Sequence, residues 1–165
     1  MASKITCRAA GPRDLKTIVA LCDALNAHLN MPTGRLEEKK FRASMFGKNA
    51  FVFCDLAEAV EDGEARPEIV GYALSHDCFT TDFGERGVYL IDVYVEPAWR
   101  RSGAGLALVR TVARRAKKRG ATHVWWGSAP SNAPARRFYA ALGASDERFH
   151  VHTLSGRAFD KLAGR

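Results

Sequence analysis

Two arginines and two glycines stand together in the middle of the chain, where they could bind a phosphate-bearing ligand. Their segment reads Arg100-Arg101-Ser102-Gly103-Ala104-Gly105 and separates an apolar run from a stretch with helical spacing. Glycines let the backbone approach a ligand without a Cβ in the way. The first turn of a helix adds amide N–H groups without intrahelical partners and a dipole that favours negative charge. The segment therefore predicts a cradle for a pyrophosphate, with Arg100 and Arg101 adding positive charge at its rim.

The loop differs from two common phosphate-binding sequences. It lacks the Lys-Ser/Thr pair of a nucleotide P-loop, and it lacks the third glycine of a dinucleotide-binding fingerprint. Because a glycine loop alone is weak evidence for any one ligand, the surrounding elements must narrow the choice.

The elements around the loop predict a βαβα unit. Residues 88–95 are an almost continuous apolar run, as in a strand buried on both faces, and Pro97 ends it. Periodicity and capping residues then predict a helix that ends at Gly120, a strand over 123–127 and a helix from about Asn132 to Gly143. A strand–helix–strand connection implies a parallel strand pair beside otherwise antiparallel strands.

The rest of the chain supplies the remaining strands and helices of one mixed sheet. The patterns predict strands at 4–9, 50–56, 68–76 and about 148–154, helices at 13–28 and 35–46, and loops at 58–64 and 77–86. No repeat, low-complexity segment or linker interrupts the 165 residues. We therefore expect a single domain over residues 1–165.

Composition excludes several classes of protein. Apolar residues make up 47% of the chain, enough for a core, but no apolar run approaches the roughly 18–20 residues of a membrane span. The first residues lack the layout of a signal peptide, so we expect a cytoplasmic protein without membrane partners. The four cysteines form no CxxC or CxxH pair, which predicts no metal site and reduced, mostly buried thiols.

Positive charge is concentrated in one stretch. The net charge is +7, and residues 100–119 hold eight basic residues and no acidic one. This favours an anionic ligand. The basic residues around one helix lack the interleaved aromatic platform or docking motif of a nucleic-acid-binding module, so we expect no nucleic-acid partner. We interpret Arg114 to Arg119 as a solvated helix face that attracts a ligand's phosphates from a distance.

From Tyr89 to Gly143 the chain resembles the GNAT family of N-acetyltransferases in motif order and spacing. The family's Arg/Gln-x-x-Gly-x-Gly/Ala motif after a buried strand stands here as residues 100–105. Its later element stands here as Asn132, Phe138-Tyr139 and Leu142-Gly143. The resemblance implies an α/β fold of the GNAT type: a mostly antiparallel sheet of about six or seven strands with a splayed parallel pair, flanked by about four helices.

The resemblance also implies a reaction and roles for residues. The reaction is acetyl transfer from acetyl-CoA, without a metal, to an amine. The implied cofactor-binding residues are Val93, Tyr94, Val95, Arg100, Arg101, Ser102, Gly103, Ala104, Gly105, Asn132, Ala135 and Tyr139. A backbone N–H near Val93 or Tyr94 would stabilise the oxyanion. Tyr139 would return a proton to the departing thiolate, because a phenol with a pKa near 10 stays protonated at neutral pH. Dimers are frequent in the family, so a homodimer is expected.

A closer likeness bears on the acceptor amine. Residues 70–74 and 89–95 look like the diamine and polyamine branch of the family, which includes spermidine/spermine and thialysine acetyltransferases. That branch usually has Glu-Asp in the second segment, whereas this chain has Ile91-Asp92. Asp92 either contacts the amine and takes its proton, alone or through a water, or caps backbone N–H groups near the strand's splay.

The sequence leaves the identity of the acceptor amine open. A small-molecule primary amine is favoured, since no targeting module accompanies the domain. A protein or peptide amine, at an N-terminus or a lysine, is the alternative, and a catalytically silent acetyl-CoA sensor is a third possibility that the presence of Tyr139 argues against.

Overall fold

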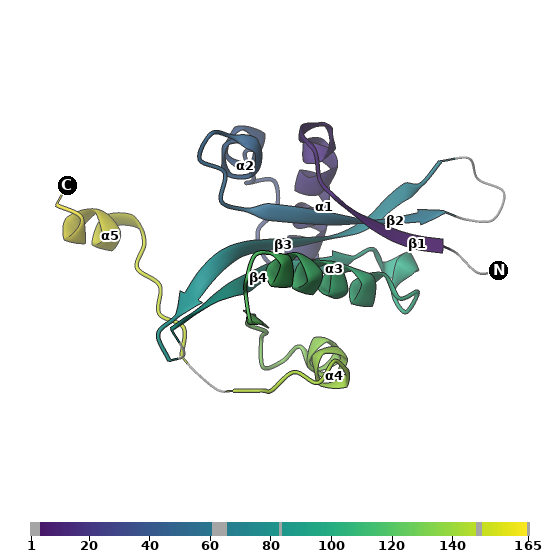
Figure 1. The fold of residues 1–165 in the computed structure, drawn as a ribbon. Coiled ribbons are helices and arrows are strands. Elements are labelled where there is room, and N and C mark those ends of the chain that lie inside the picture. The colour runs from purple at the N-terminus through teal and green to yellow at the C-terminus, as the bar shows by residue number, and fades with distance from the viewer. Residues whose placement is uncertain (1–3, 61–65, 83, 148–149, 165) are drawn as a thin grey trace. The chain divides into compact units, whose positions relative to one another are not determined.

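The computed structural model describes residues 4–60, 66–82, 84–147 and 150–164. The chain divides into two compact units, residues 1–127 and residues 128–165. The first unit holds the sheet and three α-helices, and the second holds two further α-helices, coloured green-yellow and yellow in Figure 1. Each unit is described by itself below.

The first unit is built on one five-stranded mixed sheet. Its strands are β1 (Lys4–Ala9), β2 (Phe53–Val60), β3 (Glu68–Thr80), β4 (Glu85–Val95) and β5 (His123–Trp125), in the spatial order β1-β2-β3-β4-β5. The pairs up to β3–β4 are antiparallel, and β4–β5 is parallel. The mixed sheet with one parallel pair confirms the predicted fold class.

Helices cover both faces of this sheet. They are α1 (Leu15–His28), preceded by a short 3-10 turn at Pro12–Asp14, then α2 (Glu38–Phe46) and α3 (Ala104–Lys118). The second unit contains α4 (Ala133–Ala141) and α5 (Gly156–Leu162).

The number of strands is lower than predicted. The described residues form five strands instead of six or seven, and the expected last strand is irregular over 150–154, while 148–149 lie outside the described residues. Instead, α5 follows, which makes five α-helices where about four were expected. Alternation over so few residues is a weak signal, because a strand forms only where a partner strand takes up its backbone hydrogen bonds.

The predicted loop at 77–86 is mostly strand. The β3–β4 ladder continues through Asp77, opposite Val88, as far as Thr80, opposite Glu85. Polar side chains misled the prediction here, because ladder hydrogen bonds join backbone groups regardless of side-chain polarity. Of the predicted loop at 58–64, residues 58–60 belong to β2 and residues 61–64 lie outside the described part of the chain.

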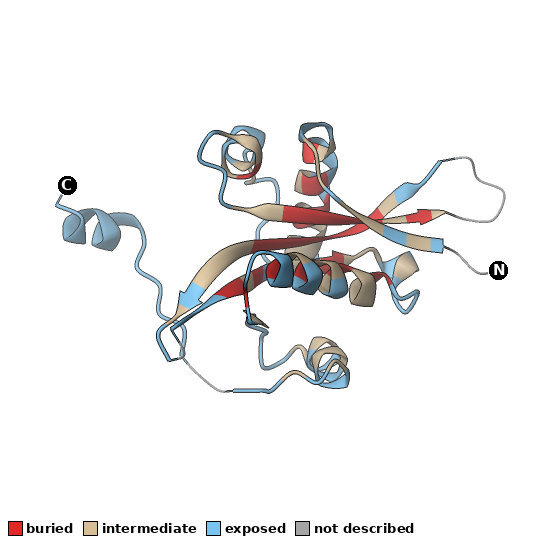
Figure 2. Cartoon of the chain, viewed as in Figure 1, coloured by how far each residue is buried: buried red, intermediate tan, exposed pale blue. Residues whose placement is uncertain are grey.

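Two apolar clusters stabilise the unit, one on each face of the sheet. Against α3 lie small and branched side chains from every strand, including Val70, Ala73, Val88 and Leu90, with Leu108 and Val112 of the helix. Against α1 and α2 lie Leu56, Tyr72, Leu74 and Tyr94, with Ile18, Leu21 and Met45. Figure 2 shows the buried residues following the strands between the helices. The cysteine prediction is confirmed for Cys22 and Cys54, which are buried, and none of the four cysteines is in a disulfide.

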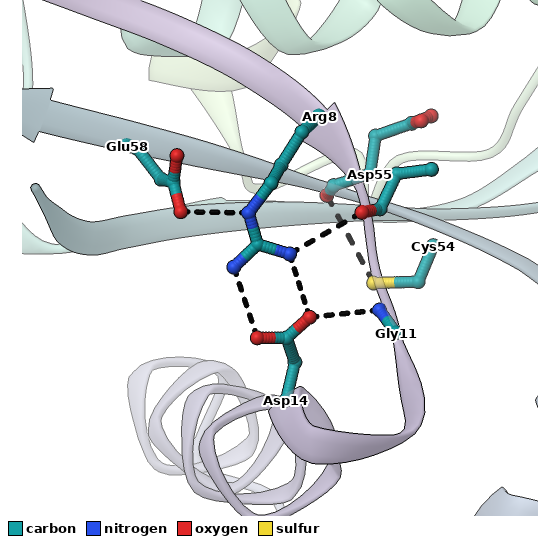
Figure 3. A network of polar contacts seen from close by, with 7 residues as sticks. Arg8, Gly11, Asp14, Cys54, Asp55 and Glu58 are labelled. Carbon is teal, nitrogen blue, oxygen red and sulfur yellow. Dashed lines mark hydrogen bonds and ion pairs between the residues drawn. The ribbon is translucent and has the colours of Figure 1, made fainter.

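An arginine on β1 ties the start of α1 to the sheet. The guanidinium of Arg8 donates to Glu58 at 2.7 Å and to both carboxylate oxygens of Asp14, at 2.6 and 2.9 Å (Figure 3). Asp14 also accepts the backbone N–H of Gly11 at 2.7 Å. These hydrogen bonds hold the pKa of Asp14 below its ordinary value. The network therefore sets where α1 begins relative to β1 and β2.

The basic run of α3 is not a solvated face throughout. Arg114, Lys117 and Lys118 are exposed as expected, but Arg115 reaches the buried carboxylate of Asp55, and Arg119 pairs with Asp77 at 2.5 Å. The prediction was wrong for Arg115, because a long side chain can lay its stem along the sheet while its guanidinium pairs with a carboxylate on a strand. Arg119 is exposed as predicted and also forms an ion pair with the sheet. Part of the basic charge therefore fastens α3 to the sheet.

Candidate active site

The glycine loop leads directly into α3, as the sequence predicts. Gly103 is the N-cap residue and has φ +92°, a left-handed conformation that glycine adopts without strain. The first intrahelical bond runs from the N–H of Ala107 to the carbonyl of Gly103 at 2.9 Å, so the amides of Gly105 and Leu106 have no carbonyl in the helix to bond.

The surroundings of this helix start fit an anionic ligand. A Cβ built on Gly103 meets no atom within 4 Å, so the backbone there faces open space. Open space, first-turn amides and the positive end of the helix dipole together suit a pyrophosphate. Ala104 is buried beneath the loop, where it packs in the α3 core cluster.

The side chains of the loop have distinct environments. Arg100 Nε donates to the carbonyl of Val95 at 3.2 Å, and its guanidinium lies 5.9 Å from the ring centre of Tyr94. Arg101 is exposed and has φ +67°, an unusual conformation for a non-glycine residue. Ser102 Oγ donates to the carbonyl of Trp99 at 2.7 Å, so its proton is used within the loop. Arg100 thus joins the loop to the end of β4.

The parallel strand pair separates after three residues. The β4–β5 pairing joins Gly87, Val88 and Tyr89 to residues 123–125 and stops there among the described residues, while β4 continues to Val95. On its other edge β4 stays paired with β3, where Gly71 lies opposite Val95. A Cβ on Gly71 would lie 2.5 Å from the carbonyl oxygen of Tyr94, so only glycine allows the two strands this approach. The backbone of residues 93–95 therefore has one edge that β5 does not cover.

A β-bulge turns Asp92 toward the α1 side of the sheet. In the β3–β4 register Leu74 is opposite Asp92, whereas Ser75 is opposite Leu90, so Ile91 is the additional residue. Leu90 packs in the cluster against α3, but Tyr94, two residues beyond Asp92, packs against α1. The extra residue thus reverses the alternation. Without the bulge, Asp92 would share the α3 face with Leu90.

Burial dominates the electrostatics of Asp92. Desolvation raises the pKa of its carboxyl group, and the nearby Tyr72 hydroxyl offsets part of that rise. A carboxylate with a raised pKa is a stronger base than one in water, which is what proton removal from an amine requires.

Three predicted site residues lie in the second unit. Asn132 caps α4, since its side-chain oxygen accepts the N–H of Ala135 at 3.2 Å. The ring centres of Tyr139 and Phe138 are 5.3 Å apart. The structure therefore brings together the loop and the end of β4 within the first unit, whereas the roles of Asn132, Ala135 and Tyr139 stay predictions from the motif.

Two residues of the first unit were not singled out from the sequence. The alternation of residues 70–74 gives Tyr72 no special role, yet it is buried near Asp92. Arg115 lies in a basic run typical of a solvated helix face, yet its guanidinium pairs with Asp55. Alternation along β3 places Tyr72 on one face, but its neighbour on β4 depends on the bulge, which no sequence signal revealed.

Among the described residues, no group of three or more His, Cys, Asp or Glu is placed to hold a metal ion. In the same part of the chain no helix has both the length and the apolar character to cross a bilayer.

Comparisons with known proteins agree with the geometry. Residues 19–144 match the model of the Acetyltransferase (GNAT) family. The thialysine N-epsilon-acetyltransferase of Bos taurus is 34% identical over 137 residues, which cover 79% of this chain and 80% of the relative. The L-ornithine N5-acetyltransferase of Arabidopsis thaliana is 30% identical over 98 residues, 57% of this chain and 43% of that protein.

Solved structures show the same fold. An integron cassette protein of V. cholerae superposes with a TM-score of 0.75 at 21% identity, covering 100% of this chain and 99% of that one. An aminoglycoside acetyltransferase from an uncultured soil metagenomic sample, solved with sisomicin, has a TM-score of 0.72 at 17% identity, covering 92% and 95%. Since the family model spans most of the sequence and the strand–loop–helix motif has the expected geometry, the chain belongs to the GNAT family of acetyltransferases.

Proposed function

We propose that the protein transfers the acetyl group of acetyl-CoA to a primary amine of a small molecule, namely a diamine, a polyamine or an amino-acid-like amine. The observation that carries this proposal is the 34% identity, over about four fifths of both chains, to thialysine N-epsilon-acetyltransferases. Family membership supports acetyl-CoA as the acetyl donor. The acceptor class is inferred from what those relatives are named for.

The first unit supplies the proposed donor site. The first-turn amides of α3 and the backbone at Gly103 bind the pyrophosphate, and Arg100 and Arg101 add positive charge. The uncovered backbone edge of residues 93–95 binds the pantetheine arm and polarises the thioester carbonyl. For Asn132 and Ala135, which belong to the second unit, the proposed contact with the pantetheine arm rests on the family motif alone.

The proposed reaction is direct attack in a ternary complex. The amine nitrogen attacks the thioester carbonyl carbon, an N–C bond forms and the C–S bond breaks. Asp92 accepts the proton that the nitrogen loses, and the Tyr139 hydroxyl gives a proton to the departing thiolate. The products are an acetamide and coenzyme A.

A thiol-release assay with a panel of amines tests the proposal. The panel contains polyamines, thialysine, lysine, ornithine, an aminoglycoside and short peptides. We expect turnover on a diamine or an amino-acid-like amine, with kcat/KM at least about tenfold above that of any peptide, a discrimination of about 1.4 kcal/mol. Turnover confined to peptides would instead support the protein acetyltransferase alternative. If no amine of the panel caused thiol release, the proposed acceptor class would be overturned.

Asp92→Asn is the matched variant for this assay. It keeps size and hydrogen-bonding capacity but removes the base, so kcat should fall while acetyl-CoA binding is retained. An unchanged kcat would exclude Asp92 as the proton acceptor.

A further inference from the structure

Tyr72 presents a polar group inside the apolar cluster that packs against α1. Its side chain is 0% exposed, and its hydroxyl makes no hydrogen bond to a described residue within ordinary geometry. Buried hydroxyls are nearly always hydrogen-bonded in native proteins, because an unpaired one costs free energy. A phenylalanine would fill the same space without the cost of burying a hydroxyl, which suggests that the Tyr72 hydroxyl has a role of its own.

The register of β3 and β4 makes Asp92 the acidic neighbour of this hydroxyl. Tyr72 is directly opposite Tyr94, and Leu74 is opposite Asp92, so Tyr72 and Asp92 are diagonal neighbours. Diagonal pairs on one face lie within reach of long side chains. The bulge at Ile91 is what places Asp92 on this face. The geometry thus brings one buried hydroxyl to one half-buried carboxylate.

The other titratable groups near the pair are the thiols of Cys22 and Cys54, the phenol of Tyr94 and the carboxylate of Asp23. On α1, burial raises the pKa of the Cys22 thiol to about 11, although the Tyr72 hydroxyl offsets part of that rise, so the thiol is protonated at neutral pH. On β2, burial also raises the pKa of Cys54. The carboxylate of Asp23, also on α1, raises the pKa of the Cys22 thiol by its charge. The Tyr72 hydroxyl is therefore the group that acts against the desolvation of Asp92.

We propose that Tyr72 is a positioning residue for Asp92, whose hydroxyl donates to the carboxylate and holds it ready to accept the proton of the acceptor amine. This inference rests on the proposed function of Asp92. It adds a residue that touches neither acetyl-CoA nor the amine and that acts through the base alone.

The sign of the effect follows from the charge state that the hydroxyl favours. A hydrogen bond to the ionised carboxylate lowers the pKa of Asp92, against the rise that burial causes. Removing the hydroxyl leaves burial unopposed, so the pKa of Asp92 rises further. Because the base must be ionised to act, the acidic limb of the kcat/KM profile moves to higher pH, and the plateau at high pH is retained.

Tyr72→Phe tests this inference with two readouts. The first is the carboxyl carbon-13 resonance of Asp92, assigned by its loss in Asp92→Asn and followed through a pH titration. The second is the pH profile of kcat/KM with the best amine of the panel. We expect the Asp92 midpoint to move to higher pH and kcat/KM on the acidic limb to fall about three- to tenfold. Tyr89→Phe is the matched control, because it removes a hydroxyl from β4, the strand that carries Asp92. It should leave the Asp92 midpoint and the pH profile of kcat/KM unchanged.

The two readouts separate this inference from the proposed function. An Asp92 midpoint that is the same in Tyr72→Phe and in the native protein overturns the role of Tyr72, whatever the activity. If the native protein acetylates none of the amines, the proposed function fails, and a shifted midpoint would still establish the Tyr72–Asp92 hydrogen bond. A uniform fall in kcat/KM at every pH, without a shift of the midpoint, would show a merely structural role.

Discussion

The guanidinium of Arg115 donates to the buried carboxylate of Asp55 at 2.5 Å, which joins α3 to the second strand of the sheet. Its other terminal nitrogen donates to Ser75 Oγ at 2.9 Å, and the group also lies 5.1 Å from the ring centre of Phe53. One arginine thus connects the helix that begins at the glycine loop to two strands. Asp55 is 2% exposed, so this carboxylate depends on Arg115 for its charge balance.

Replacing Arg115 by Met should lower the free energy of unfolding by about 3 kcal/mol, because removing one partner leaves a buried carboxylate unpaired. Arg114→Met, one residue away on the exposed side, should change it by no more than about 0.5 kcal/mol. Urea denaturation of both variants measures the difference. Equal stabilities would mean that the Arg115–Asp55 pair contributes nothing.

The same variant has a predictable pH dependence. Burial raises the pKa of Asp55 even beside Arg115, so its folded-state pKa lies above its unfolded-state pKa. The protein therefore loses stability as the pH rises from the unfolded-state pKa to the folded-state pKa. Without Arg115 the folded-state pKa of Asp55 rises further, so the loss extends to higher pH. The stability difference between Arg115→Met and the native protein should therefore shrink as the pH is lowered, which denaturation at several pH values would reveal. A difference independent of pH would contradict the assignment.

Asp14 should show the opposite dependence. Hydrogen bonds from Arg8 lower its pKa, so it contributes stability above the unfolded-state value of about 3.9, and this contribution is lost as the pH falls through the folded-state value. Asp14→Asn should cost about 1 kcal/mol at neutral pH and flatten the acid side of the stability curve. Asp146→Asn, at an exposed ion pair, should leave the curve unchanged.

Gly103→Val should abolish measurable binding of acetyl-CoA or weaken it at least about tenfold, since its Cβ would enter the open space in front of the helix amides. It also strains a left-handed backbone. Gly120→Val is the matched control, because Gly120 has φ +80° beyond the other end of α3 and no atom within 4 Å of its Cβ. Both variants should lose stability, but only the first should lose binding in calorimetry. Native affinity in Gly103→Val would refute the loop assignment.

Tyr139→Phe should lower kcat by about 100-fold, the lower range for loss of a general acid, while the dissociation constant for acetyl-CoA changes less than about twofold. Steady-state kinetics and calorimetry measure the two quantities. Full activity of the variant would remove Tyr139 as the proton donor.

Local patterns were sufficient for several elements and for the loop. The apolar run at 88–95 predicted β4, the glycines and first-turn geometry predicted the start of α3, and Asn132 was confirmed as the N-cap of α4. These features depend on residues near one another in the sequence. By contrast, the five-strand count and the extension of β3 through Asp77 depend on which strands meet, and local alternation carries no such information.

The sequence by itself determined the family and the glycine loop that opens α3, because each is encoded in a short run of side chains and backbone preferences. Only the tertiary structure decided which face of the sheet Asp92 occupies, that Tyr72 is its neighbour, and that Arg115 forms an ion pair with Asp55. The reason is physical: a one-residue bulge reverses every side chain beyond it, and a long arginine pairs with whichever carboxylate the packed strands bring within its reach.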